Sequence, residues 1–184
     1  MKVNFVKMQG AGNDYIFIDC AKYDVPDFVE TAKTLSDRHF SVGGDGVIYI
    51  FPSDVADAKM RIFNSDGTEG KMCGNGIRCA AKYVYENVSN KKETLKIETM
   101  PGIKDVRLFP DSDGRVSNAR VNMGKFKKIK EELVEASGKI RKVSLIDMGN
   151  LHAVLQVDNT SGADISEISE KVRKIKGFSE TNVE

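Results

Sequence analysis

Residues 64–79, NSDGTEGKMCGNGIRC, decide the fold because they join a glycine-rich turn to the start of a helix. In the segment that follows, 77–86, apolar residues recur at helical spacing, at Ile77, Ala80, Ala81 and Val84. Cys73 therefore stands just before the first helical turn, where unpaired backbone N–H groups and the helix dipole favour a thiolate. Gly74 and Gly76 let the backbone approach a ligand closely, so the same N–H groups could hold a carboxylate.

A lone cysteine beside a turn also has a simpler interpretation. Free cysteines are among the most buried residues, so Cys73 could be a small core residue with no chemical role. Spacing alone does not decide between a structural and a catalytic thiol. Cys79, farther along the predicted helix, and Cys20, on an apolar strand, are predicted to be core residues.

Three motifs resemble those of one enzyme family, diaminopimelate epimerase: MCGNGIRCAA (72–81), FNSDGTEG (63–70) and MQGAGNDYIFID (8–19). The resemblance spans the whole chain. It implies an α+β fold of two similar halves, each a curled, mostly antiparallel sheet around a central helix. It also implies cofactor-independent interconversion of LL- and meso-diaminopimelate, for lysine and peptidoglycan precursor biosynthesis, by two thiols that act as acid and base.

The resemblance assigns roles to particular residues. Cys73 would be one of the two acid/base thiols. Without a pyridoxal or metal electron sink, the carbanion at the α-carbon needs backbone donors at the substrate carboxylate, and Gly74 and Asn75 are expected to supply them. Substrate contacts, largely with the distal amino-carboxylate end, are implied for Asn13, Asn64, Asn150 and Asn182. Amides suit that end because they both donate and accept hydrogen bonds; from the residues alone, Asn13 is equally well a turn residue.

Two loops depart from the family pattern. Ser41 stands where the family usually has Gly, and Gly44 where it has Ala. In the family's Gly-Asn-Pro-His segment, Leu151 replaces the proline, so this loop loses a fixed φ angle. These changes bear on local loop geometry rather than on the resemblance itself.

The family pattern continues beyond residues 181–184, with a Glu-Arg pair and a second cysteine motif that carries the partner thiol. We therefore expect residues 1–118 to form a first half that carries Cys73, and residues 119–184 to form an incomplete second half. A chain of residues 1–184 with one suitably placed thiol is expected not to epimerise at an appreciable rate.

Sequence patterns predict the elements of both halves. The charged, glycine-interrupted residues 126–142 show poor periodicity, and we interpret them as a boundary segment. A capping box, Asp164 to Glu167, opens a helix that is expected to stop at Gly177. Other helices are predicted at 26–38 and 77–86, and strands at 2–8, 15–20, 47–51, 59–64, 94–99, 103–109, 115–123, 144–148 and 153–157.

Composition excludes several classes of function. The 184 residues carry 28 basic and 27 acidic side chains, so nothing favours a nucleic-acid partner. The basic cluster at 125–130 is followed directly by Glu131 and Glu132 and is interpreted as a solvated surface. No apolar run is long enough for a membrane span, and residues 1–10 lack the apolar core of a signal peptide. The expected partner is a small amino-acid substrate, and a homodimer is compatible with the family.

Cysteine and histidine usage points to a reduced, cytoplasmic protein without a metal. Three cysteines, two histidines and no CxxC motif fit neither a disulfide framework nor a zinc site. His39 is interpreted as a structural or surface histidine rather than a ligand. DSDG at 111–114 suggests calcium, but Arg115 occupies the next ligand position, so the segment is predicted to be a turn.

One further motif and two rival functions were weighed. GAGNDY after a strand resembles a dinucleotide fingerprint, but Tyr15 stands where its third glycine belongs and a strand follows instead of a helix. One rival function is a cofactor-free racemase of the same superfamily that acts on another amino acid. The other is a non-catalytic binding module that kept the fold.

Overall fold

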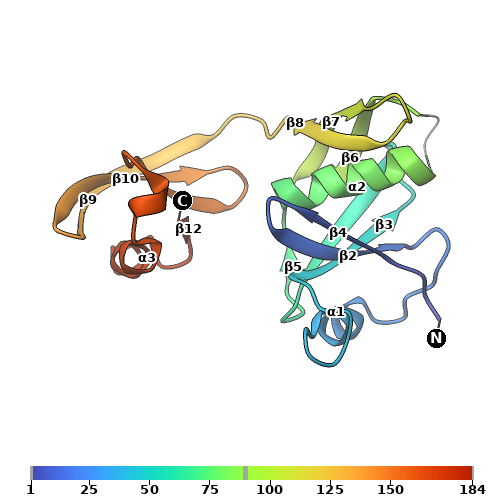
Figure 1. The fold of residues 1–184 in the computed structure, drawn as a ribbon, viewed down its shortest axis with the longest axis horizontal. Coiled ribbons are helices and arrows are strands. Elements are labelled where there is room, and N and C mark those ends of the chain that lie inside the picture. Colours follow the sequence, from blue (N-terminus) through green and yellow to red (C-terminus); the bar gives the residue numbers. More distant parts are fainter. Residues whose placement is uncertain (1, 89–90, 184) are drawn as a thin grey trace. The chain divides into compact units, whose positions relative to one another are not determined.

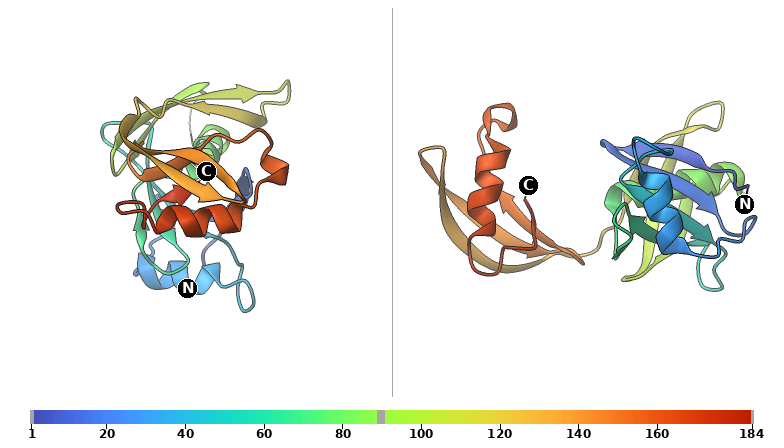
Figure 2. Two further views of the ribbon diagram at one scale, coloured as in Figure 1. Left: turned by 90° about the vertical axis from the view of Figure 1, so that its left-hand side faces the viewer. Right: turned by 90° about the horizontal axis from the view of Figure 1, so that it is seen from below.

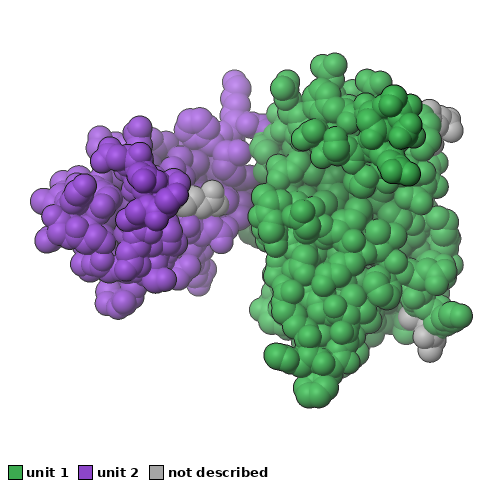
Figure 3. Space-filling view, in the orientation of Figure 1, with its two compact units in different colours: residues 1–123 green, residues 124–184 purple. Residues whose placement is uncertain are grey.

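The computed structural model of this chain describes residues 2–88 and 91–183. It contains two compact units, residues 1–123 and residues 124–184 (Figure 3). The predicted division after residue 118 falls within strand β8 (Val116–Val121), and the structure keeps that whole strand in unit 1. Each unit has its own sheet and its own helix-covered core, which confirms the predicted α+β class.

Unit 1 is built on an eight-stranded sheet in the order β1-β2-β3-β4-β6-β7-β8, with the short β5 paired to β4. Its other strands are β1 (Val6–Gly10), β2 (Asn13–Asp19), β3 (Gly46–Phe51), β4 (Ala58–Asn64), β5 (Glu69–Gly70), β6 (Thr94–Thr99) and β7 (Gly102–Pro110). Pairing is antiparallel except for β2–β3 and β4–β6. Parallel neighbours need a crossover connection, and helices α1 (Phe28–Ser36) and α2 (Gly74–Asn87) lie in these two connections.

The two helices cover opposite faces of the sheet (Figures 1 and 2). Alternation along β2 supplies both cores, because successive side chains of a strand point to opposite faces. Tyr15 and Phe17 belong to the core under α2, whereas Ile16 and Ile18 belong to the core that contains Phe28 of α1. The strand is therefore buried on both faces.

Helix α2 packs through the apolar positions that the sequence predicts. Its buried side includes Ile77, Ala80, Ala81 and Val84, and the helix begins at Gly74 rather than at Ile77. Cys73 is its N-cap residue. The predicted central helix of unit 1 is thus confirmed, and the cysteine lies at the expected end of it.

Unit 2 has a four-stranded sheet in the order β12-β11-β10-β9. Its strands are β9 (Lys127–Ala136), β10 (Lys139–Asp147), β11 (Leu151–Leu155) and β12 (Asn182–Val183), and its helices are the 3₁₀ turn η1 (Thr160–Gly162) and α3 (Ile165–Arg173). Ile168 and Val172 of α3 pack with Val143 of β10 and Phe178 in one core. Asp164 caps α3 as predicted, accepting a hydrogen bond from the Glu167 N–H at 3.0 Å.

The structure corrects the interpretation of residues 126–142. They form most of the β9–β10 hairpin, whose two-residue turn is Ser137-Gly138, with φ of 51° and 67°. Positive φ at both turn residues matches the twist of a hairpin. The Glu167 carboxylate holds this turn by accepting from the Ser137 N–H at 3.1 Å, instead of closing a capping box on its own helix.

Several other boundaries differ from the sequence predictions. The first strand begins at Val6 rather than at residue 2. The gap between the strands predicted at 2–8 and 15–20 shrinks to Ala11-Gly12, because Gly10 pairs with Asn13 across a tight hairpin turn. Helix α3 ends at Arg173, before Gly177, whose φ is 89°.

Candidate active site at the start of helix α2

The Cys73 side chain caps the N-terminus of helix α2. Its backbone is extended, with φ −137° and ψ 113°, and its Sγ accepts a hydrogen bond from the Gly76 N–H at 3.3 Å. Its carbonyl oxygen accepts from the Ile77 N–H at 2.9 Å. A sulfur at an N-cap takes the place of the oxygen that usually satisfies these donors. The side chain is only partly buried, so the thiol is held by the helix and still reachable.

The next two backbone donors remain available. Among residues 2–88 and 91–183, no acceptor takes the N–H groups of Gly74 or Asn75. The first N–H groups of a helix point along its axis, where the dipole adds positive potential. A carboxylate beside Cys73 would find two donors here.

A surface pocket borders this turn. It is formed by α2, β7 and β8, and its lining residues include Gly74, Arg78, Phe109, Arg120 and Met123. Gly74 contributes backbone rather than side chain, and the two arginines contribute positive charge. An anionic group can therefore approach the first turn of α2 from this side.

Gly76 packs closely against a side chain of the sheet. A Cβ at position 76 would lie 2.6 Å from Cδ1 of Ile48, closer than such atoms approach. The absence of a side chain lets α2 start directly above β3.

Asn13 and Asn75 bind each other. Asn75 Nδ2 donates to Asn13 Oδ1 at 2.8 Å, and the Arg78 guanidinium donates to Asn75 Oδ1. A Cβ at Gly10 would lie 3.1 Å from the Asn75 carbonyl oxygen, so the β1–β2 turn packs tightly against the first turn of α2. The structure brings Asn13, Asn75 and Cys73 together from distant parts of the sequence. Asn13 is the first residue of β2 and closes the hairpin turn by pairing with Gly10.

Tyr15 is the residue of this site that the sequence reasoning missed. Its side chain is 6% exposed and belongs to the core cluster against which Cys73 packs. Burial, and then the nearby Cys73 thiolate, raise the pKa of the Tyr15 hydroxyl well above its ordinary value. The signal in the sequence was the two-residue alternation from Asn13, which places both side chains on one face of β2.

Asn64 lies on the same face of the sheet as Tyr15, two strands away. Across neighbouring strands, Tyr15 pairs with Gly46 and Gly46 pairs with Asn64, so the three share one face of the sheet. A Cβ on Gly46 would lie 2.2 Å from the Phe63 carbonyl oxygen, so only glycine fits between the two polar side chains. Asn64 Nδ2 donates to Thr68 Oγ1 at 3.0 Å, which ties Asn64 to the turn that leads to Cys73.

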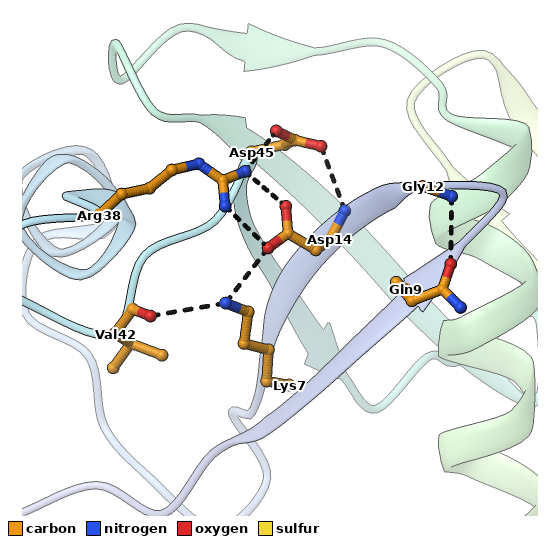
Figure 4. Close-up of polar contacts among 7 residues, drawn as sticks. All are labelled: Lys7, Gln9, Gly12, Asp14, Arg38, Val42 and Asp45. Carbon is orange, nitrogen blue, oxygen red and sulfur yellow. Dashed lines mark hydrogen bonds and ion pairs between the residues drawn. The ribbon is translucent and has the colours of Figure 1, made fainter.

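The opposite face of β2 carries a charged cluster that anchors the site from behind (Figure 4). Arg38 donates to both carboxylate oxygens of Asp14, at 2.6 and 3.1 Å, and to Asp45 at 2.9 Å. Lys7 of β1 lies 3.1 Å from the Asp14 carboxylate. Hydrogen bonds from Arg38, with help from Lys7, lower the pKa of Asp14 to about 2. Asp14 lies between Asn13 and Tyr15, so this cluster fixes the strand that presents them.

The other two cysteines have different surroundings. Burial, followed by the charge of Asp19, raises the pKa of Cys20 to about 11. Burial also raises the pKa of Cys79. Both thiols stay protonated near neutral pH, in agreement with their predicted place in the core.

In unit 2 the predicted substrate contacts Asn150 and Asn182 both neighbour His152. Asn150 Oδ1 lies 3.1 Å from His152 Nε2. His152 is paired with Asn182 between the parallel strands β11 and β12. The two asparagines thus belong to one end of the unit 2 sheet, whereas Cys73, Asn13, Asn64 and Asn75 belong to unit 1.

In residues 2–88 and 91–183, no three His, Cys, Asp or Glu side chains are grouped so that they could hold a metal ion. No helix in this part of the chain is long and apolar enough to cross a membrane.

Comparison with known sequences yields a consistent set of relatives. The profile of the family described as diaminopimelate epimerase matches residues 5–129. The diaminopimelate epimerase of Acetivibrio thermocellus is 42% identical over 183 residues, covering 92% of this chain and 65% of that protein. The one from Brachyspira hyodysenteriae is 40% identical and covers 100% of this chain and 71% of that protein. The chain therefore spans about two thirds of the length of these relatives.

Solved structures with little sequence similarity share the fold. A Bacillus anthracis phenazine biosynthesis protein of the PhzF family has a TM-score of 0.64 at 20% identity, covering 88% of this chain and 58% of that one. A probable proline racemase from Agrobacterium radiobacter K84 has a TM-score of 0.63 at 16% identity, covering 85% of this chain and 52% of that one. At these identities the likeness concerns architecture alone.

Proposed function

This chain belongs to the diaminopimelate epimerase family, and from that premise we propose that it forms the Cys73 part of a cofactor-independent epimerase for LL- and meso-diaminopimelate. The observation that carries the proposal is the position of Cys73. Its thiol caps α2 beside the two unoccupied N–H groups of Gly74 and Asn75. A base and a carboxylate-binding pair lie next to each other, as abstraction of an α-proton requires.

The proposed reaction begins with the substrate carboxylate at the N–H groups of Gly74 and Asn75. The Cys73 thiolate takes the α-proton, and the electron pair left on the α-carbon spreads into the carboxylate. The two backbone donors stabilise the added negative charge on its oxygens. A second thiol on the opposite face then donates its proton to the α-carbon, which inverts it. In the reverse direction the two thiols exchange roles.

The distal end of the substrate is proposed to meet the amides of Asn64, Asn150 and Asn182. An ammonium and a carboxylate on one carbon need both acceptors and donors, which amides provide. Asn13 is proposed as a substrate contact too, and its present hydrogen bond with Asn75 would then be exchanged for one with the substrate. Asn150 and Asn182 carry a separate part of this proposal because they belong to unit 2.

Residues 1–184 alone are proposed not to epimerise. Of their three cysteines, Cys73 stands at a helix start, while Cys20 and Cys79 have raised pKa values. One thiol serves one face of the α-carbon, so this chain is expected to exchange the α-hydrogen for solvent deuterium with retention of configuration. Epimer formation within about tenfold of the rate of the product of the whole reading frame would contradict the two-thiol mechanism.

The substrate is tested on the product of the whole reading frame that contains residues 1–184. We expect interconversion of LL- and meso-diaminopimelate, followed by chiral chromatography, and no comparable turnover in a panel of other amino acids that includes proline. Faster turnover of another amino acid would identify a different racemase. A folded protein that turns over none of them, but binds one, would be a binding module.

Cofactor dependence, location and assembly complete the proposal. Activity is expected to survive chelators and carbonyl reagents and to be lost on thiol alkylation; loss on chelation that added metal restores would contradict it. We propose a cytoplasmic enzyme, in keeping with three cysteines that are all free thiols. A homodimer is tested separately, by light scattering on the same protein.

A further inference from the structure

Arg78 lies on α2 one helical turn after Asn75, and its partly buried side chain lines the surface pocket beside Gly74. The first turn of α2 contains no acidic residue, and the N-terminal end of a helix favours negative rather than positive side chains. In the described part of unit 1, residues 2–88 and 91–123, the Arg78 guanidinium forms no ion pair with a carboxylate. Neither a carboxylate nor the helix dipole therefore accounts for an arginine at this position.

The Arg78 side chain binds the Asn75 amide. Its guanidinium donates to Asn75 Oδ1, three residues earlier on the same side of the helix. A guanidinium has five donors and no acceptor, so the amide atom that it meets must be the oxygen. The contact therefore fixes which way the Asn75 amide is turned, with its oxygen toward Arg78 and its nitrogen away from it.

The orientation of the Asn75 amide determines the orientation of Asn13. Asn75 Nδ2 donates to Asn13 Oδ1 at 2.8 Å, from the first turn of α2 to the first residue of β2. Because its oxygen is held by Arg78, Asn75 offers Asn13 a donor, and Asn13 turns its own oxygen toward α2. The backbones are in close contact at the same place, since a Cβ at Gly10 would lie 3.1 Å from the Asn75 carbonyl oxygen. Arg78 thus acts on Asn13 through one intermediate side chain.

We propose that Arg78 is a positioning residue that acts through Asn75 to present the Asn13 oxygen, an acceptor, to an ammonium group of the substrate. The group that replaces Asn75 Nδ2 at Asn13 Oδ1 must itself be a donor, and an amino acid carries such a donor on its ammonium nitrogen. This inference rests on the proposed function, because it gives a polarity to the substrate contact proposed for Asn13. Without Arg78, the Asn75 amide is free to turn over, and Asn13 would then present its nitrogen, which an ammonium does not bind.

The first measurement is a double-mutant cycle in the product of the whole reading frame, with Arg78→Met and Asn75→Ala, and it follows the KM for LL-diaminopimelate. Each single change is expected to raise KM roughly tenfold and to leave kcat within about threefold, because a contact that also holds the ground state is lost. The double variant should show the same rise of roughly tenfold, because Arg78 has no effect once the Asn75 side chain is gone. A rise of about a hundredfold, the product of two independent effects, would overturn the proposal.

Two further variants separate positioning from folding. Arg115→Met removes the same charge from an exposed turn of unit 1 and should leave KM and kcat unchanged. Arg78→Lys keeps a cation with N–H donors at the same position, so KM should return to within about threefold of the wild-type value. Loss of folded protein lowers kcat and leaves KM as it was. A change in kcat alone for Arg78→Met would therefore overturn the proposal.

The second measurement needs no substrate and uses NMR of the same protein labelled with ¹⁵N-asparagine. The side-chain amide signal of Asn13 is identified as the one missing from Asn13→Ala. Arg78→Met is expected to shift this signal when Asn75 is present and to leave it in place when Asn75 is already alanine. A signal that does not respond to Arg78→Met, or responds equally in both backgrounds, would overturn the proposal. If Arg78→Met does not fold, Arg78→Lys takes its place in this cycle, with the same required dependence on Asn75.

The two measurements distinguish failure of this proposal from failure of the proposed function. If the full reading-frame product does not epimerise diaminopimelate, the NMR cycle still reports whether Arg78 orients Asn13 through Asn75. If it does epimerise but the Asn13 signal does not respond to Arg78, the function stands and the role of Arg78 fails.

Discussion

The first two turns of helix α2 each present a cysteine, yet only one of them is placed for chemistry. Cys73 caps the helix, takes an N–H bond on its sulfur and remains partly accessible. Cys79 faces the sheet, is 9% exposed, and has its pKa raised by burial. The same side chain is a candidate base at the N-terminus of the helix and an inert core residue on its buried face.

Replacing each cysteine in turn should give the largest difference between the two positions. In the full reading-frame product, Cys73→Ala is expected to lower the epimerisation rate by roughly 10³-fold, since a positioned acid/base is lost. Cys79→Ala should leave the rate within about threefold and reduce thermal stability slightly through a small cavity. Chiral chromatography and thermal melts measure the two effects. Equal loss of activity in both variants would show that the first turn has no special role.

Selective labelling sharpens the comparison without any substrate. At pH 8 in the 184-residue protein, Cys73 is expected to alkylate on the order of 100-fold faster than Cys20 or Cys79. Cys20, with a pKa of about 11, is almost entirely protonated at that pH, and Cys79 is shielded by the core. Peptide mapping after brief iodoacetamide treatment ranks the three. Labelling led by Cys79 would mean that Cys73 is merely structural.

The glycines of the first turn test how closely the turn is pressed on the sheet. Gly76→Ala should destabilise the protein by about 1–3 kcal/mol, because its Cβ would lie 2.6 Å from Cδ1 of Ile48. Gly74→Ala is the control: its Cβ would meet only Met123 side-chain atoms, at 3.8 Å, so stability should change by less than about 0.5 kcal/mol. Urea unfolding of both variants gives the difference, and equal effects would contradict the packing explanation.

The smallest expected effect is on stability and concerns the ion pairs of Asp14 with Arg38 and Lys7. The folded-state pKa of Asp14 is about 2, below its unfolded value of 3.8, so its contribution is full above pH 4 and is lost as the pH falls toward 2. Asp14→Asn should cost on the order of 1 kcal/mol near pH 6, a figure reduced because Arg38 and Lys7 are half-exposed. The deficit should shrink on acidification. Asp113→Asn, an exposed change of equal charge, should show no such pH dependence in urea unfolding.

Much of this architecture could be predicted from the sequence. The spacing of Ile77, Ala80 and Val84 indicated α2, and the glycines around Cys73 indicated a helix start. Alternation indicated most strands of unit 1, because their inner residues are apolar. Local patterns carry this information directly, since each residue reports its own burial.

The missed features depend on neighbours that the sequence does not place. Leu133 and Ile140 are 68% and 71% exposed on the outer face of β9–β10, so apolar residues on both faces hid the alternation of that hairpin. The Glu167 carboxylate accepts a hydrogen bond from the Ser137 N–H, 30 positions away in the sequence, and does not close the predicted capping box. Tyr15 was predicted only as a strand residue, because its neighbours in the sequence do not indicate that it shares a core with Cys73. Such roles arise only when distant segments pack.

Strand β2 carries Asn13 and Tyr15 on one face and Asp14 between them on the other. A slip of one residue in its pairing would exchange these faces. It would bury the Asp14 carboxylate beside the thiol and turn the phenol toward α1. In a chain that folded with this error, the Cys73 sulfur would lie near the Asp14 carboxylate instead of Tyr15. Its reactivity would therefore differ from that of the native thiol. During refolding, the rate at which Cys73 gains its native reactivity would therefore report strand registration, a step that is usually silent to spectroscopy.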